Sequence, residues 1–147
     1  KAKDDPQTKA ATTIQKTYRR YISQKEFNKQ KSMFKRRSNI AQELRETEKT
    51  YVQNLILLSN TFLEPLEKVP AKILGDLQTN LHLIASIVNV ILSYHKIILT
   101  KIEERLDTWS PCTKLGDIFM EMSSFLKSYT QYVAYYQPVL RVLRSRK

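Results

Sequence analysis

The stretch that decides the fold is residues 39–52, which read NIAQELRETEKTYV. It contains neither glycine nor proline, and its apolar residues begin a stripe that continues at spacings of three, four or seven. Such spacings place side chains on one face of an α-helix. The pattern predicts a helix over Asn39–Glu67, capped by Asn39 with Gln42 and kinked or stopped near Pro65. Its apolar stripe consists of Ile40, Leu44, Tyr51, Leu55, Leu58, Phe62 and Leu66.

More helices are expected on the C-terminal side. Pro70 starts one helical turn that reaches Gly75, and Asp76 can cap the next helix. A break is expected at residues 107–111, then a helix from Leu115 to Tyr136 that Pro138 interrupts, then a short last helix. Only two glycines and five prolines occur, so the composition favours an all-α fold. The helix after Asp76 has a heptad-like seam, typical of a bundle: Leu77, Leu81, Ile84, Val88, Ile91, His95, Ile98 and Ile102.

The most apolar stretch is residues 81–100, and it is interpreted as a buried bundle helix. Polar residues recur in it at helical intervals, whereas a membrane span would need about twenty mostly apolar residues. The single cysteine, Cys112, excludes an internal disulfide and fits a reducing compartment.

The N-terminal segment carries most of the net charge of +11. Residues 1–37 contain twelve Lys/Arg and three Asp/Glu, a net charge of +9, whereas residues 38–147 have a net charge of +2. Asp5 and Pro6 suit a helix start, and this helix is expected to run to about Lys35, with a joint at residues 36–39. Such a basic segment favours an acidic partner: calmodulin, an anionic membrane surface or nucleic acid.

Residues 14–25, IQKTYRRYISQK, resemble the IQ motif that binds calmodulin and related light chains. The expected anchors are Ile14, Tyr18 and Ile22, which share one helix face and can enter a hydrophobic groove. The resemblance departs from the family at two positions, where Arg20 replaces a glycine and Gln24 replaces a basic residue. The expected calmodulin-binding residues are Ile14, Gln15, Tyr18, Arg19, Arg20, Ile22 and Lys25.

Residues 38–143 resemble the Dbl-homology (DH) domain of Rho guanine-nucleotide exchange factors. Residues 39–52 are similar to that family's first conserved region, and Phe62-Leu63-Glu64-Pro65-Leu66 continues the match. Residues 84–95 are similar to the second region, although Asn89 and Val90 stand where the family has an acidic pair. Two later stretches, Leu115–Phe119 and Phe125–Tyr132, resemble the family's I-G-D-x-F pattern and its Y-x-x-Y helix.

The resemblance implies an elongated helical bundle that contacts a Rho-family small GTPase through Glu43. It implies no catalytic residue, metal or cofactor, because exchange makes and breaks no covalent bond. Tyr51 and His95 are expected to be core residues. The chain ends before the family's third conserved region, so a partial bundle is expected, one that has little exchange activity by itself and self-associates through uncovered apolar faces.

The predicted organisation is an extended IQ helix and linker over residues 1–37 and a partial DH domain over residues 38–147. The favoured function is nucleotide exchange on a Rho-family GTPase, with calmodulin or a calmodulin-like light chain as second partner. One alternative is a calmodulin-binding helical scaffold without exchange activity. A basic nucleic-acid or membrane binder is less favoured, because the bundle is nearly neutral, and no specific nucleic acid is expected. The expected location is cytoplasmic, with recruitment to the membrane periphery.

Overall fold

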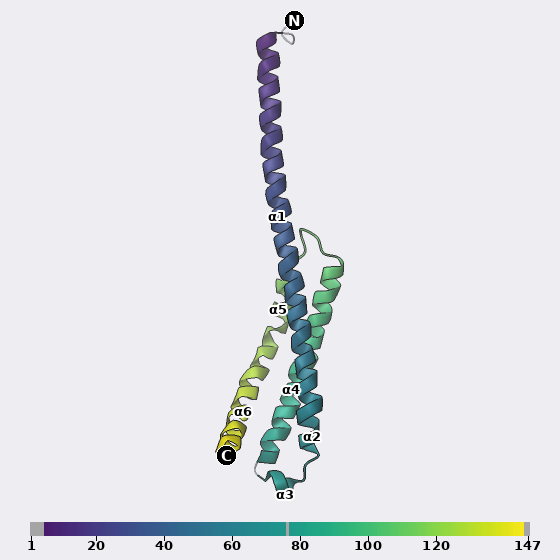
Figure 1. The fold of residues 1–147 in the computed structure, drawn as a ribbon, viewed down its shortest axis with the longest axis vertical. Coiled ribbons are helices and arrows are strands. Elements are labelled where there is room, and N and C mark those ends of the chain that lie inside the picture. The colour runs from purple at the N-terminus through teal and green to yellow at the C-terminus, as the bar shows by residue number, and fades with distance from the viewer. Residues whose placement is uncertain (1–4, 76, 146–147) are drawn as a thin grey trace. The chain divides into compact units, whose positions relative to one another are not determined.

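The computed structural model describes residues 5–75 and 77–145. These residues form helices joined by turns, with no strand among them, so the predicted all-α fold class is confirmed (Figure 1). The chain divides into two compact units, Lys1–Ile40 and Ala41–Lys147, and helix α1 (Pro6–Leu58) contributes residues to both.

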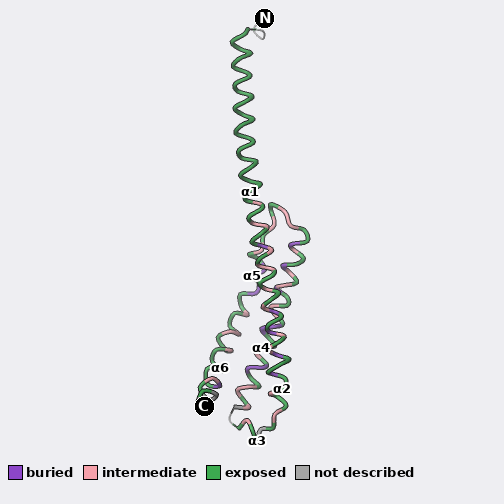
Figure 2. Tube along the Cα trace, viewed as in Figure 1, coloured by how far each residue is buried: buried purple, intermediate pink, exposed green. Residues whose placement is uncertain are grey.

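Helix α1 begins where the sequence predicts. The Thr8 backbone N–H donates to Asp5 Oδ2 at 3.3 Å, and the Lys9 N–H donates to the Asp5 carbonyl at 3.1 Å. Pro6 is the first helical residue, a position where a missing N–H leaves no hydrogen bond unmade. Every residue from 5 to 33 is exposed, and none up to residue 40 is buried (Figure 2). The first unit is therefore a helix without a core of its own.

The predicted joint at residues 36–39 is wrong, because these residues are helical within α1. None of Arg36, Arg37, Ser38 and Asn39 is glycine or proline, and each lowers helix stability by less than about 0.7 kcal/mol relative to alanine. Asn39 thus occupies a helix interior and does not cap a new helix.

From residue 40 onward, the buried face of the chain differs from the predicted apolar stripe. Leu55 is buried as expected, but Ile40 is 55% exposed and Phe62 is 57% exposed, whereas Ala41 and Leu63 are buried. The reason near Phe62 is a π-helical turn, Ser59–Leu63, that follows α1. Its wider i→i+5 turn shifts the helix face by one residue, so that Leu63 replaces Phe62 in the core.

Short helices connect α1 to the next long helix. Helix α2 (Glu64–Glu67) ends where the sequence predicts, and α3 (Ala71–Leu74) is the single turn expected after Pro70. Gly75 then adopts φ 56°, a left-handed conformation that side chains with a Cβ disfavour. The predicted cap, Asp76, lies outside the described residues.

Helix α4 (Leu77–Asp107) supplies the centre of the second unit. It is long and apolar enough to cross a membrane by length and composition alone, a test that soluble core helices also pass. It packs along α6 (Lys127–Ser145) and also contacts α5 (Gly116–Met122) and α2. Five members of the predicted seam are buried: Ile84, Val88, Ile91, Ile98 and Ile102. Leu81 and His95 are half-buried, and the side chain of Leu77 lies outside what the structure describes.

The C-terminal helices differ from prediction in where they break. A 3₁₀ turn, Ser123–Leu126, separates α5 from α6, and Ser123 Oγ donates to the Met120 carbonyl at 2.8 Å there. The predicted interruption at Pro138 is wrong, since α6 continues through it. Proline in a helix interior costs about 3 kcal/mol. Two features offset this. Ala134 is an exposed residue, so its carbonyl, which loses its N–H partner to Pro138, can bind water, and Val139 is buried in the core.

Two apolar clusters form the core of the second unit. One joins α1, α4 and α6 through residues that include Val52, Val88 and Val139. The other joins α1, α4 and α5 through residues that include Ala41, Ile102 and Ile118. Together they hold the C-terminal half of α1, which carries Glu43, against the rest of the second unit.

Candidate partner-binding surfaces

The predicted IQ anchors lie exposed on α1. Ile14 is 70% exposed, Tyr18 is 64% exposed and Ile22 is 39% exposed. Their spacing of four residues aligns them along one helix face. Thr13, Thr17 and Tyr21 join Ile14 and Tyr18 around a shallow depression. Apolar side chains presented in this way are available to a partner's groove, since no core covers them.

The predicted polar IQ residues are exposed on the same helix. Gln15, Arg19, Arg20 and Lys25 are all exposed. Within the described part of the chain, no hydrogen bond or ion pair engages these four side chains. The segment thus combines an apolar face with cations that are not neutralised, which is the chemistry of a helix that enters an acidic, apolar groove.

The predicted GTPase contact, Glu43, lies on the C-terminal half of α1 in the second unit. Its side chain is exposed, and no hydrogen bond or ion pair holds its carboxylate among the described residues. By contrast, the neighbouring Glu46 pairs with Arg45 at 2.5 Å. Both glutamates border an open surface depression with Thr47, Thr50, Tyr51 and Asn54. Glu43 is therefore a fully available hydrogen-bond acceptor on an ordered helix.

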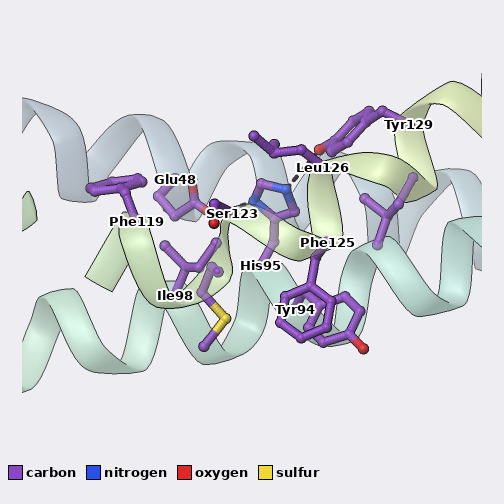
Figure 3. A pocket seen from close by; sticks show the side chains of 11 residues that line it. Glu48, Tyr94, His95, Ile98, Phe119, Ser123, Phe125, Leu126 and Tyr129 are labelled. Carbon is purple, nitrogen blue, oxygen red and sulfur yellow. Dashed lines mark hydrogen bonds and ion pairs between the residues drawn. The ribbon is translucent and has the colours of Figure 1, made fainter. Parts of the chain in front are cut away.

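A chain of hydrogen bonds lies behind this surface and links three helices. His95 on α4 contacts the Glu48 carboxylate of α1 through Nδ1, and its Nε2 lies 2.6 Å from the Tyr129 hydroxyl of α6 (Figure 3). The Tyr129 hydroxyl lies 2.8 Å from that of Tyr51 on α1, and the Tyr51 ring meets the His95 ring edge-on, with centroids 4.6 Å apart. The half-buried Tyr51 and His95 therefore join helices, in agreement with their predicted core roles.

The surroundings of Tyr129 favour the protonated form of its hydroxyl. Burial, and after it the hydrogen bond with Tyr51, raises the pKa of Tyr129 well above its ordinary value. A tyrosine hydroxyl is protonated at neutral pH in any case, and the raised pKa keeps this proton available for donation at more alkaline pH. Partly buried polar groups that are paired in this way stabilise one arrangement of the helices, because each would lose a partner if the helices moved apart.

A cavity of about 190 Å³ lies beside this hydrogen-bond chain. Figure 3 shows His95 and Glu48 among its lining side chains, together with the apolar side chains of Ile98, Phe119 and Leu126. Phe125 stacks on Tyr94 with ring centroids 3.3 Å apart. The lining comes from α1, α4, α5 and α6, so the cavity belongs to the core of the second unit.

The start of α5 is tied to the end of α4 by a two-pronged ion pair. Arg105 donates to both carboxylate oxygens of Asp117, at 3.2 and 2.9 Å, and to the Lys114 carbonyl at 2.6 Å. The hydrogen bonds from Arg105 lower the pKa of the Asp117 carboxyl. Asp117 belongs to the stretch Leu115–Phe119 that resembles the family pattern, and the structure gives it this positioning role.

Glu48 is the residue that sequence reasoning missed. It was not expected to pair with His95, which lies 47 positions away in the sequence. Its spacing in the sequence does indicate an inward-facing position, because Glu48 lies three residues before Tyr51 and four after Leu44, on the side of the helix that faces the core.

Comparison with protein families gives two matches. The model described as "RhoGEF domain" matches residues 40–147, and the model described as "IQ calmodulin-binding motif" matches residues 8–28. No solved structure matches the chain significantly.

Two of the curated proteins similar to this chain have names that contain RhoGEF or guanine exchange factor, and a third is named as a myosin. FYVE, RhoGEF and PH domain-containing protein 2 of Homo sapiens is 31% identical over 105 residues, which are 71% of this chain and 16% of that protein. Guanine exchange factor for Rac 30 of Dictyostelium discoideum is 36% identical over 110 residues, which are 74% of this chain and 6% of that protein. Myosin-M heavy chain of the same organism is 31% identical over 114 residues, which are 76% of this chain and 6% of that protein. The chain thus spans a small part of the length of these relatives.

Proposed function

Because the chain belongs to the RhoGEF domain family and carries an IQ motif, we propose that it acts in guanine-nucleotide exchange on a Rho-family small GTPase. The observation that carries the proposal is Glu43, an exposed carboxylate on a helix of the RhoGEF-matching region that pairs with no other described residue. At this position the resemblance places the glutamate that engages the first switch region of the GTPase.

The mechanism requires no covalent chemistry. An exchange factor binds the nucleotide-free GTPase more tightly than the loaded form, so it shifts the population toward the empty state and GDP dissociates faster. Glu43 would accept hydrogen bonds from donors of the first switch region and hold that region away from the nucleotide. The chain Glu48–His95–Tyr129–Tyr51 would keep the Glu43-bearing part of α1 in place beneath the contact.

We also infer a calmodulin-type partner for the IQ segment. The exposed anchors Ile14, Tyr18 and Ile22 support it, together with the cations Arg19, Arg20 and Lys25 and the glutamine Gln15. A calmodulin lobe offers an apolar groove with acidic surroundings, which complements this face in both respects. The segment lies outside the RhoGEF-matching residues, so its occupant would regulate exchange and would not take part in it.

The test is release of a fluorescent GDP analogue from a panel of purified Rho-family GTPases, with and without the full-length protein. Faster release from at least one GTPase is expected, and that GTPase should bind the protein more tightly when nucleotide is removed. If no member of the panel responds while calmodulin still binds, the exchange proposal fails and the scaffold alternative stands.

A further inference from the structure

A run of cations on α1 lies beyond the IQ match. The basic segment, residues 27–37, reads FNKQKSMFKRR and contains five Lys/Arg and no Asp/Glu. The IQ match ends at residue 28, so it includes none of these cations: Lys29, Lys31, Lys35, Arg36 and Arg37. A calmodulin-type partner on residues 8–28 therefore leaves the basic segment unexplained.

Most side chains of the basic segment are exposed, and most of its positive charges are not balanced by a neighbouring carboxylate among the described residues. Phe27 is 59% exposed and Met33 is 56% exposed, and only Phe34 and Arg37 are half-buried. Across the described residues, Lys29, Lys31, Lys35 and Arg36 form no ion pair with a carboxylate. Like charges four residues apart on a helix, such as Lys31 and Lys35, repel each other. An external anionic surface would remove this repulsion.

The mixture of side chains indicates the kind of anionic surface. Lys29, Met33 and Arg36 lie at spacings of four and three, so they share one helix face. On a bilayer, lysine and arginine reach the phosphate level while an apolar side chain among them enters the boundary with the acyl chains. A binder of single-stranded nucleic acid would instead present a series of aromatic platforms for stacking. Phe27 is the one well-exposed aromatic residue of the segment.

We propose that residues 27–37 dock this protein on membrane surfaces that contain anionic phospholipids. The attraction is mainly electrostatic and acts within about 10 Å of the surface at 0.1 M salt. Phe27 and Asn28 belong both to this segment and to the IQ match. A calmodulin-type protein on the IQ segment would cover this overlap and bring its own acidic residues to the cations. Membrane and calmodulin therefore exclude each other, a consequence that rests on the proposed calmodulin binding.

The test is sedimentation of the 147-residue chain with phosphatidylcholine vesicles, with or without phosphatidylserine. Binding is expected only with phosphatidylserine, and it should weaken as salt rises. The double substitution Lys29→Glu/Arg36→Glu should weaken vesicle binding roughly thirtyfold or more, at about fivefold for each cation lost. The matched control is Lys68→Glu/Lys72→Glu, which changes the net charge equally at two exposed sites of the second unit. An equal loss in the control would overturn the proposal, because only total charge would then matter.

A second pair of measurements separates this proposal from calmodulin binding. Lys29→Glu/Arg36→Glu should retain calmodulin in calorimetry, whereas Ile14→Ala/Arg19→Ala should lose calmodulin and still bind the vesicles. Added calmodulin should release the unsubstituted chain from vesicles but not the Ile14→Ala/Arg19→Ala variant. If the chain binds vesicles but calmodulin does not release it, the competition is refuted while the membrane site stands. Equal binding to pure phosphatidylcholine, or binding to single-stranded DNA without binding to vesicles, would overturn the membrane site.

Discussion

At the scale of single residues, a substitution of Glu43 tests the contact with the GTPase without disturbing the fold. It is exposed and lies outside both core clusters, so Glu43→Ala should change the free energy of unfolding by less than about 0.5 kcal/mol. A charge-assisted hydrogen bond to the GTPase contributes roughly 1.5–3 kcal/mol, so nucleotide release by the full-length protein should slow roughly ten- to hundredfold. The control is Glu104→Ala, the same change at an exposed position of α4. Wild-type exchange with an unchanged melting curve in Glu43→Ala would show that this glutamate is not the contact.

Tyr129 provides the opposite case, in which a hydroxyl supports the fold. Tyr129→Phe removes the group that joins His95 to Tyr51 and leaves both without that partner in a half-buried site. The expected loss is about 1–3 kcal/mol in the free energy of unfolding, measured by urea denaturation. The control is Tyr136→Phe, since the Tyr136 hydroxyl makes no hydrogen bond within the described structure. Equal stability of the two variants would mean that the hydrogen-bond chain contributes nothing.

Some of these residue roles were readable in the sequence and some were not. The exposure of Glu43 follows from helix periodicity, because it lies off the apolar stripe that includes Leu44 and Leu55. The Glu48–His95 contact does not, because nothing local specifies which group on another helix will face a given carboxylate. The IQ anchors Ile14, Tyr18 and Ile22 are an intermediate case: their shared face follows from their spacing, while their exposure depends on whether another element covers that face.

At the scale of elements, the IQ helix should bind its partner through both apolar and charged groups. Ile14→Ala/Arg19→Ala removes one exposed anchor and one exposed cation, so calmodulin affinity measured by calorimetry should fall strongly. Hot-spot side chains that fill a groove typically contribute about 2 kcal/mol or more, which is roughly a thirtyfold change in affinity. The control is Thr8→Ala, at the start of the IQ match and outside the anchor set. If the double variant binds calmodulin with unchanged affinity, the face that carries Ile14 and Arg19 is not the binding site.

Helix boundaries were predictable where the signal was local. Asp5 with Pro6 marks the start of α1, and Pro70 marks the turn that becomes α3, because capping and proline geometry act over a few residues. The continuity of α6 through Pro138 was not predictable, because the packing of Val139 comes from a distant part of the chain. The joint predicted at residues 36–39 is absent for a related reason: polar residues permit a break in a helix but do not force one.

At the scale of the whole molecule, the two units should differ in local stability. Residues 5–33 are exposed throughout, and isolated helices in water are marginally stable, whereas α4 carries much of the core. Amide hydrogen exchange followed by mass spectrometry should therefore be fast over residues 6–33 and slow over residues 84–102. Added calmodulin should slow exchange over residues 8–28 and leave α4 unchanged. Similar protection of both regions in the free chain would contradict this view.

The π-helical turn at Ser59–Leu63 also bears on how this chain compares with others in evolution. A π-helical turn contains one more residue than the α-helical turn it replaces, so it can arise by a single-codon insertion into an unbroken helix. A chain without this insertion would lack one residue between Ser59 and Leu63, where Asn60 and Thr61 are exposed and so could be lost without opening the core. In such a chain the counterparts of Ser59 and Leu63 would stand three apart and still share the buried face. An alignment gap at this point would therefore mark a change in chain length that leaves the core intact.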